Sequence, residues 1–97
     1  MRLSDKEKKE ILSAITSLDP NAKIYLHGSR VNDELKGGDI DLLVISNQIS
    51  LSNKLGILTS IKEKIGEQKI DLVIKTLDEA KSDAFVMNVL SKAVSLN

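Results

Sequence analysis

Cysteine is absent from this sequence, and proline and aromatic residues are scarce. The lack of cysteine excludes disulfide bonds, thiolate metal sites and a cysteine nucleophile, and a chain without disulfides is easiest to place in the cytoplasm. Tyr25 and Phe85 are the only aromatic residues, and Pro20 is the only proline. A hydrophobic core must therefore consist mainly of Leu, Ile and Val.

An excess of charge of one sign is also lacking, because 14 Lys and Arg residues balance 14 Asp and Glu residues. Such a chain has no overall field that attracts nucleic acid, so we expect no strong nucleic-acid binding. No apolar run approaches the ~20 residues of a membrane-spanning helix, and the polar N-terminus is unlike a signal peptide. The length of 97 residues predicts one small domain, 1–97, with a modest core.

Hydrophobic spacing predicts an alternation of helices and short strands. A first helix begins after Ser4, which has capping-box spacing to Glu7, and ends at Asp19-Pro20. A last helix begins at Thr76, with Glu79 three residues on, and Gly66 is a plausible stop for the helix before it. Strands are expected at 22–27, 40–45 and 70–74, a middle helix at 51–65, a polar loop at 31–38 and a short final strand at 94–96.

Apolar residues at helical spacing predict the buried face of each helix. The predicted stripes are Ile11, Leu12, Ile15 and Leu18 in the first helix, Leu51, Leu55, Leu58, Ile61 and Ile65 in the second, and Ala80, Ala84, Met87 and Leu90, or close alternatives to these, in the last. The middle helix links two apolar strands, which should therefore lie parallel, while the first two strands can pair antiparallel. We expect an α/β (α+β) fold, a small mixed β-sheet with helices packed on one face.

The informative residues are three aspartates near strand starts. Asp39 and Asp41 are two positions apart, so their side chains point to one face of the strand. Asp71 precedes a Leu-Val-Ile run much as Asp41 precedes Leu-Leu-Val-Ile. In a parallel pair of strands, the three carboxylates would converge at one edge of the sheet. Clustered carboxylates without His or Cys suit Mg²⁺, with Mn²⁺ as the alternative, and two ions ~3.5–4 Å apart can serve a phosphoryl displacement.

Gly28 and Ser29 end the preceding strand and could form a phosphate-binding turn. Glycine permits close backbone approach, and amides with the Ser29 hydroxyl can hold phosphate oxygens, while Arg30 could neutralise phosphate charge. Taken singly, a Gly-Ser pair is usually a turn and an Asp-x-Asp a solvated strand end. Their order and spacing together favour the functional interpretation. We expect packing or an edge hydrogen bond, rather than catalysis, for His27.

The combination of Gly28-Ser29, nine further residues and Asp39-Ile40-Asp41 resembles the signature of the DNA polymerase beta-type nucleotidyltransferase superfamily. From about residue 22 to residue 96 the chain is especially similar to the minimal nucleotidyltransferase (MNT) proteins. The resemblance implies a nucleotidyltransferase fold, a nucleoside triphosphate such as ATP at Gly28, Ser29 and Arg30, and metal binding and catalysis by Asp39, Asp41 and Asp71.

The resemblance also implies a partner. MNT proteins typically act as antitoxins of HEPN toxins and, in characterised cases, transfer AMP from ATP onto a toxin tyrosine. This chain departs from relatives at residues 31–33, which replace a common Arg-Gly, and at Gly38, which replaces a usual Ser. The alternative is therefore a catalytically weak or inactive antitoxin that neutralises its partner by binding alone. A transferase acting on tRNA or an antibiotic is a weaker third hypothesis, and a homo-oligomer stays open.

Overall fold

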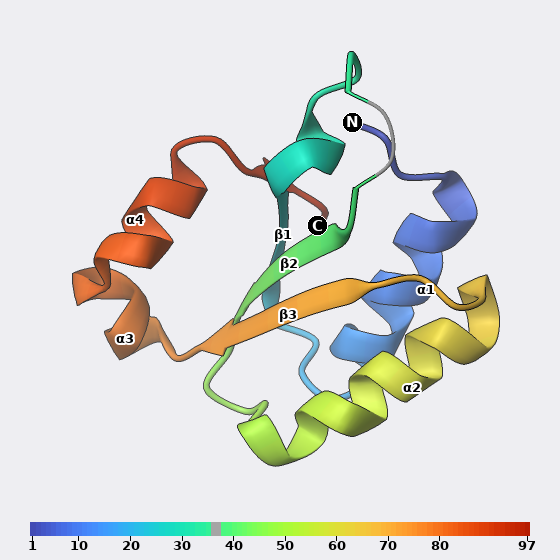
Figure 1. Cartoon of the computed structure of the whole chain (residues 1–97). Helices are drawn as coiled ribbons and strands as arrows, with labels where there is room; N and C mark the ends of the chain where they lie inside the picture. The colour runs from blue at the N-terminus through green and yellow to red at the C-terminus, as the bar shows by residue number, and fades with distance from the viewer. Residues whose placement is uncertain (36–37) are drawn as a thin grey trace.

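The computed structural model describes residues 1–35 and 38–97, so Lys36 and Gly37 of the predicted loop lie outside the described residues (Figure 1). The elements are, in chain order, α1 (Asp5–Thr16), β1 (Lys23–His27), the 3₁₀ turn η1 (Gly28–Val31), β2 (Ile40–Ile45), the 3₁₀ turn η2 (Leu51–Asn53), α2 (Lys54–Ile65), β3 (Ile70–Lys75), α3 (Leu77–Ser82), α4 (Ala84–Leu90) and β4 (Val94–Ser95). All four predicted strands are confirmed to within a residue at each end.

The four strands form one mixed sheet in the order β3-β2-β1-β4. β1 pairs antiparallel with β2 and with β4, whereas β2 pairs parallel with β3. The parallel pair is joined by a connection that contains α2, because parallel strands cannot be linked by a tight turn. Both pairings agree with the predictions, and the mixed α+β class is confirmed.

Helices cover both faces of the sheet, which differs from the prediction of helices on one face. Leu42 of β2 belongs to the core formed with α1 and α2, whereas its neighbour Leu43 packs with Val86 and Val89 of α4. Figure 1 shows the sheet between α1 and α2 on one side and α3 and α4 on the other. The reason lies in the continuous apolar run of β2, which presents apolar side chains to both faces and requires cover on each.

The first helix has the predicted start and a shorter end. The backbone N–H of Glu7 donates to Ser4 Oγ at 3.0 Å, and the N–H of Ser4 donates to the Glu7 carboxylate at 2.9 Å, which confirms the capping box. The helix ends at Thr16, whose hydroxyl donates to a carbonyl in the preceding turn. Such local bonds compete with continued helix. Leu18 therefore lies beyond the helix and is 46% exposed, so its predicted place on the buried stripe is wrong.

The buried face of α2 agrees with the prediction in part, because Leu58 and Ile65 pack against the core as predicted. Ile61 is buried as predicted, but Leu51 and Leu55 are each 75% exposed and Ile57 is buried in their place. Leu51 belongs to a separate 3₁₀ turn before α2. Leu55 lies in α2, but at 3.6 residues per turn it is about 120° from Ile61 around the helix, so the two do not share one face. Gly66 ends α2 with φ of +89°, as the predicted stop requires.

The predicted last helix is two helices. The capping box of Thr76 and Glu79 is confirmed at the start of α3. A break follows at Asp83, whose carboxylate accepts from the backbone N–H of Phe85 at 2.8 Å and begins α4. Val86 and Val89 are buried in α4, whereas Met87 is 62% exposed. The predicted place of Met87 on the buried stripe is therefore wrong. Within residues 1–35 and 38–97, no helix is long and apolar enough to cross a membrane.

Candidate active site

Two of the three predicted carboxylates stand side by side at one end of the sheet. Asp41 of β2 and Asp71 of β3 are direct partners in the parallel register, as the sequence predicted. Asp39 precedes β2 by one residue, and its carboxylate lies 3.4 Å from the ammonium of Lys69. In the described part of the chain, no group of three His, Cys, Asp or Glu side chains is arranged to hold a metal ion as it stands.

The electrostatics of Asp41 show that the site concentrates negative charge. Burial raises the pKa of Asp41 above its ordinary value of 3.8, and the positive field of His27 opposes this rise. The charges of Asp71 and Asp39 raise the pKa of Asp41 further, whereas Lys69 lowers it. A cation among these three carboxylates would relieve their mutual repulsion, so the donor set fits a hard divalent ion such as Mg²⁺.

Gly28 is fitted to the carboxylate of Asp41. The last residue of β1, His27, is the register partner of Asp41, so the chain turns into η1 directly beside that carboxylate. Gly28 has a φ of +75°, and a β-carbon added there would overlap Oδ2 of Asp41. Glycine is thus required both by the backbone conformation and by the close approach of the side chain. The close contact predicted for Gly28 is made here with a carboxylate of the same site.

A second glycine brings Ser29 against the start of β2. Gly38 has a φ of +90°, and a β-carbon added there would overlap the hydroxyl oxygen of Ser29. Gly38 immediately precedes Asp39, so the Gly-Ser turn and the Asp-x-Asp segment touch at two glycines. The sequence marked Gly38 only as a departure from relatives. Its contact could not be foreseen, because it depends on how the chain between the two segments folds back.

The guanidinium of Arg30 faces backbone and amide oxygens in this structure. Its Nη1 donates to the carbonyl of Arg2 at 2.9 Å, its Nε to the carbonyl of Gly38 at 3.3 Å and its Nη2 to Gln68 Oε1 at 3.2 Å. These contacts support the loop, whereas a role of Arg30 in phosphate binding stays a prediction. Sequence reasoning missed Arg2 and Gln68, because no spacing links them to a motif.

His27 packs against α4. Its ring meets that of Phe85 edge to face, with centroids 6.2 Å apart and an interplanar angle of 83°. Its Nε2 is buried and has no hydrogen-bond partner among the residues described. The packing agrees with the expectation for His27, and it seats the first turn of α4 next to the carboxylates.

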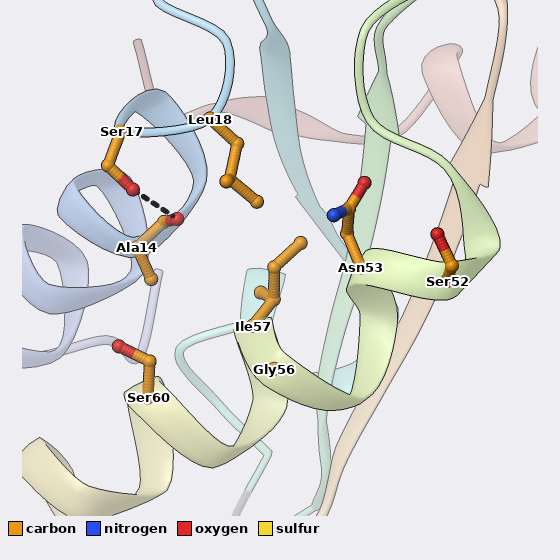
Figure 2. Close-up of a pocket in the computed structure, with 8 residues that line it drawn as sticks. All are labelled: Ala14, Ser17, Leu18, Ser52, Asn53, Gly56, Ile57 and Ser60. Carbon is orange, nitrogen blue, oxygen red and sulfur yellow. Dashed lines mark hydrogen bonds between the residues drawn. The ribbon is translucent and has the colours of Figure 1, made fainter.

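Three cavities in the described residues lie away from the carboxylates. One of about 300 Å³ lies between α1 and α2 and is lined by Ser17, Leu18, Asn53 and Ile57, among others (Figure 2). The other two, of about 350 and 290 Å³, share Asn47 and lie beyond the opposite end of β2. None of the three is lined by Asp39, Asp41 or Asp71, so the candidate site at these carboxylates lies outside the three cavities.

The class of this protein follows from its match to a family of domains. Residues 8–96 match the nucleotidyltransferase domain family, and this chain belongs to that family. The resemblance that the Gly-Ser and Asp-x-Asp motifs suggested is thus confirmed for the family. Among curated proteins, none matches the sequence significantly.

Solved structures of two toxin–antitoxin complexes share the fold. A chain in a mutant of the toxin–antitoxin MntA–HpeT superposes with a TM-score of 0.67 at 17% identity, over 93% of this chain and 71% of that one. A chain in the complex of tri-AMPylated Shewanella oneidensis HEPN toxin with MNT antitoxin superposes with a TM-score of 0.62 at 20% identity, over 94% and 69%. At this identity the likeness shows the nucleotidyltransferase fold, as predicted.

Proposed function

We propose that this chain transfers AMP from ATP to a tyrosine hydroxyl of a HEPN toxin in the cytoplasm and so acts as an antitoxin. Membership of the nucleotidyltransferase family supports nucleotidyl transfer. The Shewanella oneidensis complex holds a tri-AMPylated HEPN toxin together with an MNT antitoxin, which supports a HEPN toxin as the acceptor. The observation that carries the proposal is the parallel register of Asp41 and Asp71, beside Gly28 and Ser29.

The carboxylates of Asp39, Asp41 and Asp71 would hold two Mg²⁺ ions. When bound, Mg²⁺ supplies positive charge that offsets the triphosphate and favours ionisation of the acceptor hydroxyl. Asp39 must then exchange its contact with Lys69 for the ion. This exchange costs little, because both side chains of that ion pair are substantially exposed and such pairs are weak.

The residues of the chain have distinct roles in the proposed transfer. Ser29 and the backbone of Gly28 hold oxygens of the triphosphate and orient its α-phosphorus. The acceptor oxygen attacks the α-phosphorus, and a new P–O bond forms as the bond to pyrophosphate breaks. The carboxylate of Asp71 accepts the proton of the acceptor hydroxyl, and pyrophosphate leaves. Asp71 is exposed on β3, which suits an acceptor carried on the surface of another protein.

The proposal is tested by label transfer. The chain and its genomically neighbouring partner are incubated with ATP labelled at the α-phosphate and Mg²⁺, and label on the partner is measured. Asp41→Asn and Asp71→Asn should abolish transfer, whereas Asp78→Asn should not, because Asp78 is an exposed carboxylate on α3. Transfer that persists in Asp41→Asn, or no transfer by the unaltered chain, would refute the proposal.

A binding-only antitoxin is the second candidate. The ion pair between Lys69 and Asp39, together with the absence of a ready three-carboxylate cluster among the described residues, favours it. Calorimetric titration of the chain with ATP and Mg²⁺ distinguishes the two. Binding in the micromolar range supports the transferase, whereas no binding, with toxin neutralisation kept by Asp39→Ala, supports the binding-only antitoxin.

A further inference from the structure

The segment before α1 lies alongside the turn that carries Ser29. The backbone N–H of Arg2 donates to the carbonyl of Arg30 at 2.7 Å, and Nη1 of Arg30 donates to the carbonyl of Arg2 at 2.9 Å. Arg2 and Arg30, which are 28 positions apart in the sequence, are thus joined by two hydrogen bonds, one donated by each residue. The extended segment that leads into α1 is thereby fixed against η1.

The side chain of Arg2 donates to one carbonyl within the same turn and to one directly after it. Its Nη2 donates to the carbonyl of Ser29 at 3.0 Å, and its Nε donates to the carbonyl of Asn32 at 3.1 Å. The carbonyl of Ser29 also accepts from the N–H of Asn32 at 3.2 Å. A guanidinium that donates to carbonyls at the end of a helical turn stabilises that turn through hydrogen bonds and through its charge.

Arg30 extends this contact to the other end of the loop. Its Nε donates to the carbonyl of Gly38, which precedes the Asp-x-Asp segment and lies against the Ser29 hydroxyl. Its Nη2 contacts Gln68, which in turn donates to the carboxylate of Glu7 at 2.7 Å. The backbone on both sides of the Ser29 hydroxyl is therefore tied to the first turn of α1 and to the segment before β3.

We propose that Arg2 is a positioning residue for triphosphate binding, acting through the backbone of Ser29. This inference rests on the proposed function. A turn that is already fixed loses less conformational freedom when it binds phosphate oxygens, so the hydrogen bonds from Arg2 favour binding of the triphosphate. Arg2 lies outside residues 8–96, the part of the chain that matches the family, so the family match does not assign it a role.

The first test measures order in the turn and needs no nucleotide. Hydrogen exchange of the full chain is compared with that of Arg2→Ala and of Lys6→Ala, an exposed residue of the same N-terminal region. Arg2→Ala should raise the exchange rates of backbone amides in residues 28–32 about tenfold, the loss expected for hydrogen bonds to a charged group, and leave β2 and β3 unchanged. Equal rates in Arg2→Ala and Lys6→Ala would overturn the proposal.

The second test is a double-mutant cycle with Ser29→Ala. Arg2→Ala should raise the KM for ATP about tenfold, with a smaller change in kcat, and Arg2→Lys should restore part of the loss. The effect of Arg2→Ala on the KM should be smaller in the Ser29→Ala background, because the turn then offers backbone amides but no hydroxyl to the triphosphate. An effect there as large as in the unaltered chain would mean that Arg2 does not act by placing Ser29, which overturns the proposal. If Arg2→Ala does not fold, Arg2→Lys carries the same cycle.

These outcomes separate the inference from the proposed function. A chain that neither binds ATP nor transfers label refutes the transferase, yet the exchange experiment still shows whether Arg2 orders the turn. Conversely, full activity of Arg2→Ala with an unchanged KM refutes the positioning role and leaves the transferase intact.

Discussion

The carboxylate of Asp41 lies against the α-carbon of Gly28, at a point where any β-carbon would overlap its Oδ2. The contact joins the end of β1 to the start of β2, because His27 and Asp41 are register partners. The turn that we propose to bind phosphate and the carboxylate of Asp41 are therefore placed relative to each other by direct packing.

Gly28→Ala should abolish label transfer and lower stability. The positive φ alone costs about 1–2 kcal/mol for a residue with a side chain, and the methyl group must also displace the Asp41 carboxylate. Gly56→Ala in α2 is the matched control, because no atom lies within 4 Å of its added β-carbon. It should keep activity and raise stability by about 0.4–1 kcal/mol. Thermal unfolding and label transfer of both variants check the prediction, and an active Gly28→Ala would contradict it.

Removing the charge of Asp41 should stabilise the metal-free chain at neutral pH. Its folded-state pKa is raised, so the group favours folding most below the unfolded value of 3.8, and this contribution is lost as pH rises through the folded pKa. Asp41→Asn should thus unfold at a higher temperature than the unaltered chain at pH 7 without metal, and the difference should close below about pH 3.8. Melting curves from pH 3 to pH 8 test this, with exposed Asp78→Asn as control. An Asp41→Asn that is less stable at pH 7 would show that its interactions outweigh its charge.

The ion pair of Lys75 and Asp83, 2.9 Å long, should stabilise α4 in a pH-dependent way. The hydrogen bond from Lys75 lowers the pKa of Asp83, and backbone amides of α4 lower it further. The contribution is present above the unfolded pKa and is lost as pH falls through the lowered folded pKa. Asp83→Asn keeps the cap and loses the charge, whereas Asp83→Ala loses both. At pH 7 the melting temperature should be highest for the unaltered chain, lower for Asp83→Asn and lowest for Asp83→Ala. In acid, the difference between the unaltered chain and Asp83→Asn should become smaller. Equal melting temperatures for all three would refute the role of Asp83.

The buried face of α2 predicts very different effects of two substitutions on stability. Ile61→Ala removes a fully buried side chain and should cost about 2–5 kcal/mol of unfolding free energy. Leu55→Gln alters an exposed residue and should change that free energy by less than about 0.5 kcal/mol. Urea unfolding of both variants measures the difference. A large loss in Leu55→Gln would mean that the face predicted from spacing is the buried one.

The sequence predicted the parts of the site that depend on strand geometry. The repeated Asp-Leu start of two apolar runs, joined by a helix, was enough to predict that Asp41 and Asp71 would align. Side-chain alternation and parallel pairing are regular, so the position of Asp41 in its strand predicts the position of Asp71 in the neighbouring strand. The capping boxes at Ser4 and Thr76 were predicted for the same reason, since each is a local pattern of fixed spacing.

The predictions that failed depend on the rotational position of residues around a helix or on contacts between residues far apart in the sequence. Leu51 was misplaced because it lies in a 3₁₀ turn before α2, and Leu55 because it is about 120° from Ile61 around the helix. Asp83 was read as part of a helix although its carboxylate could cap a new one. The contact of Arg2 with Ser29 joins segments that are 27 residues apart, and no local pattern marks such a pair.

The order of the strands separates the two substrates of the proposed reaction. β2 carries Asp41 between β1, which leads into Gly28 and Ser29, and β3, which carries Asp71 at the margin of the described sheet. The nucleotide would thus be held on one flank of Asp41 and the acceptor presented from the other. Substitutions along the outer side of β3 could then change which protein is modified while leaving the choice of nucleotide untouched, so that the two specificities can evolve independently.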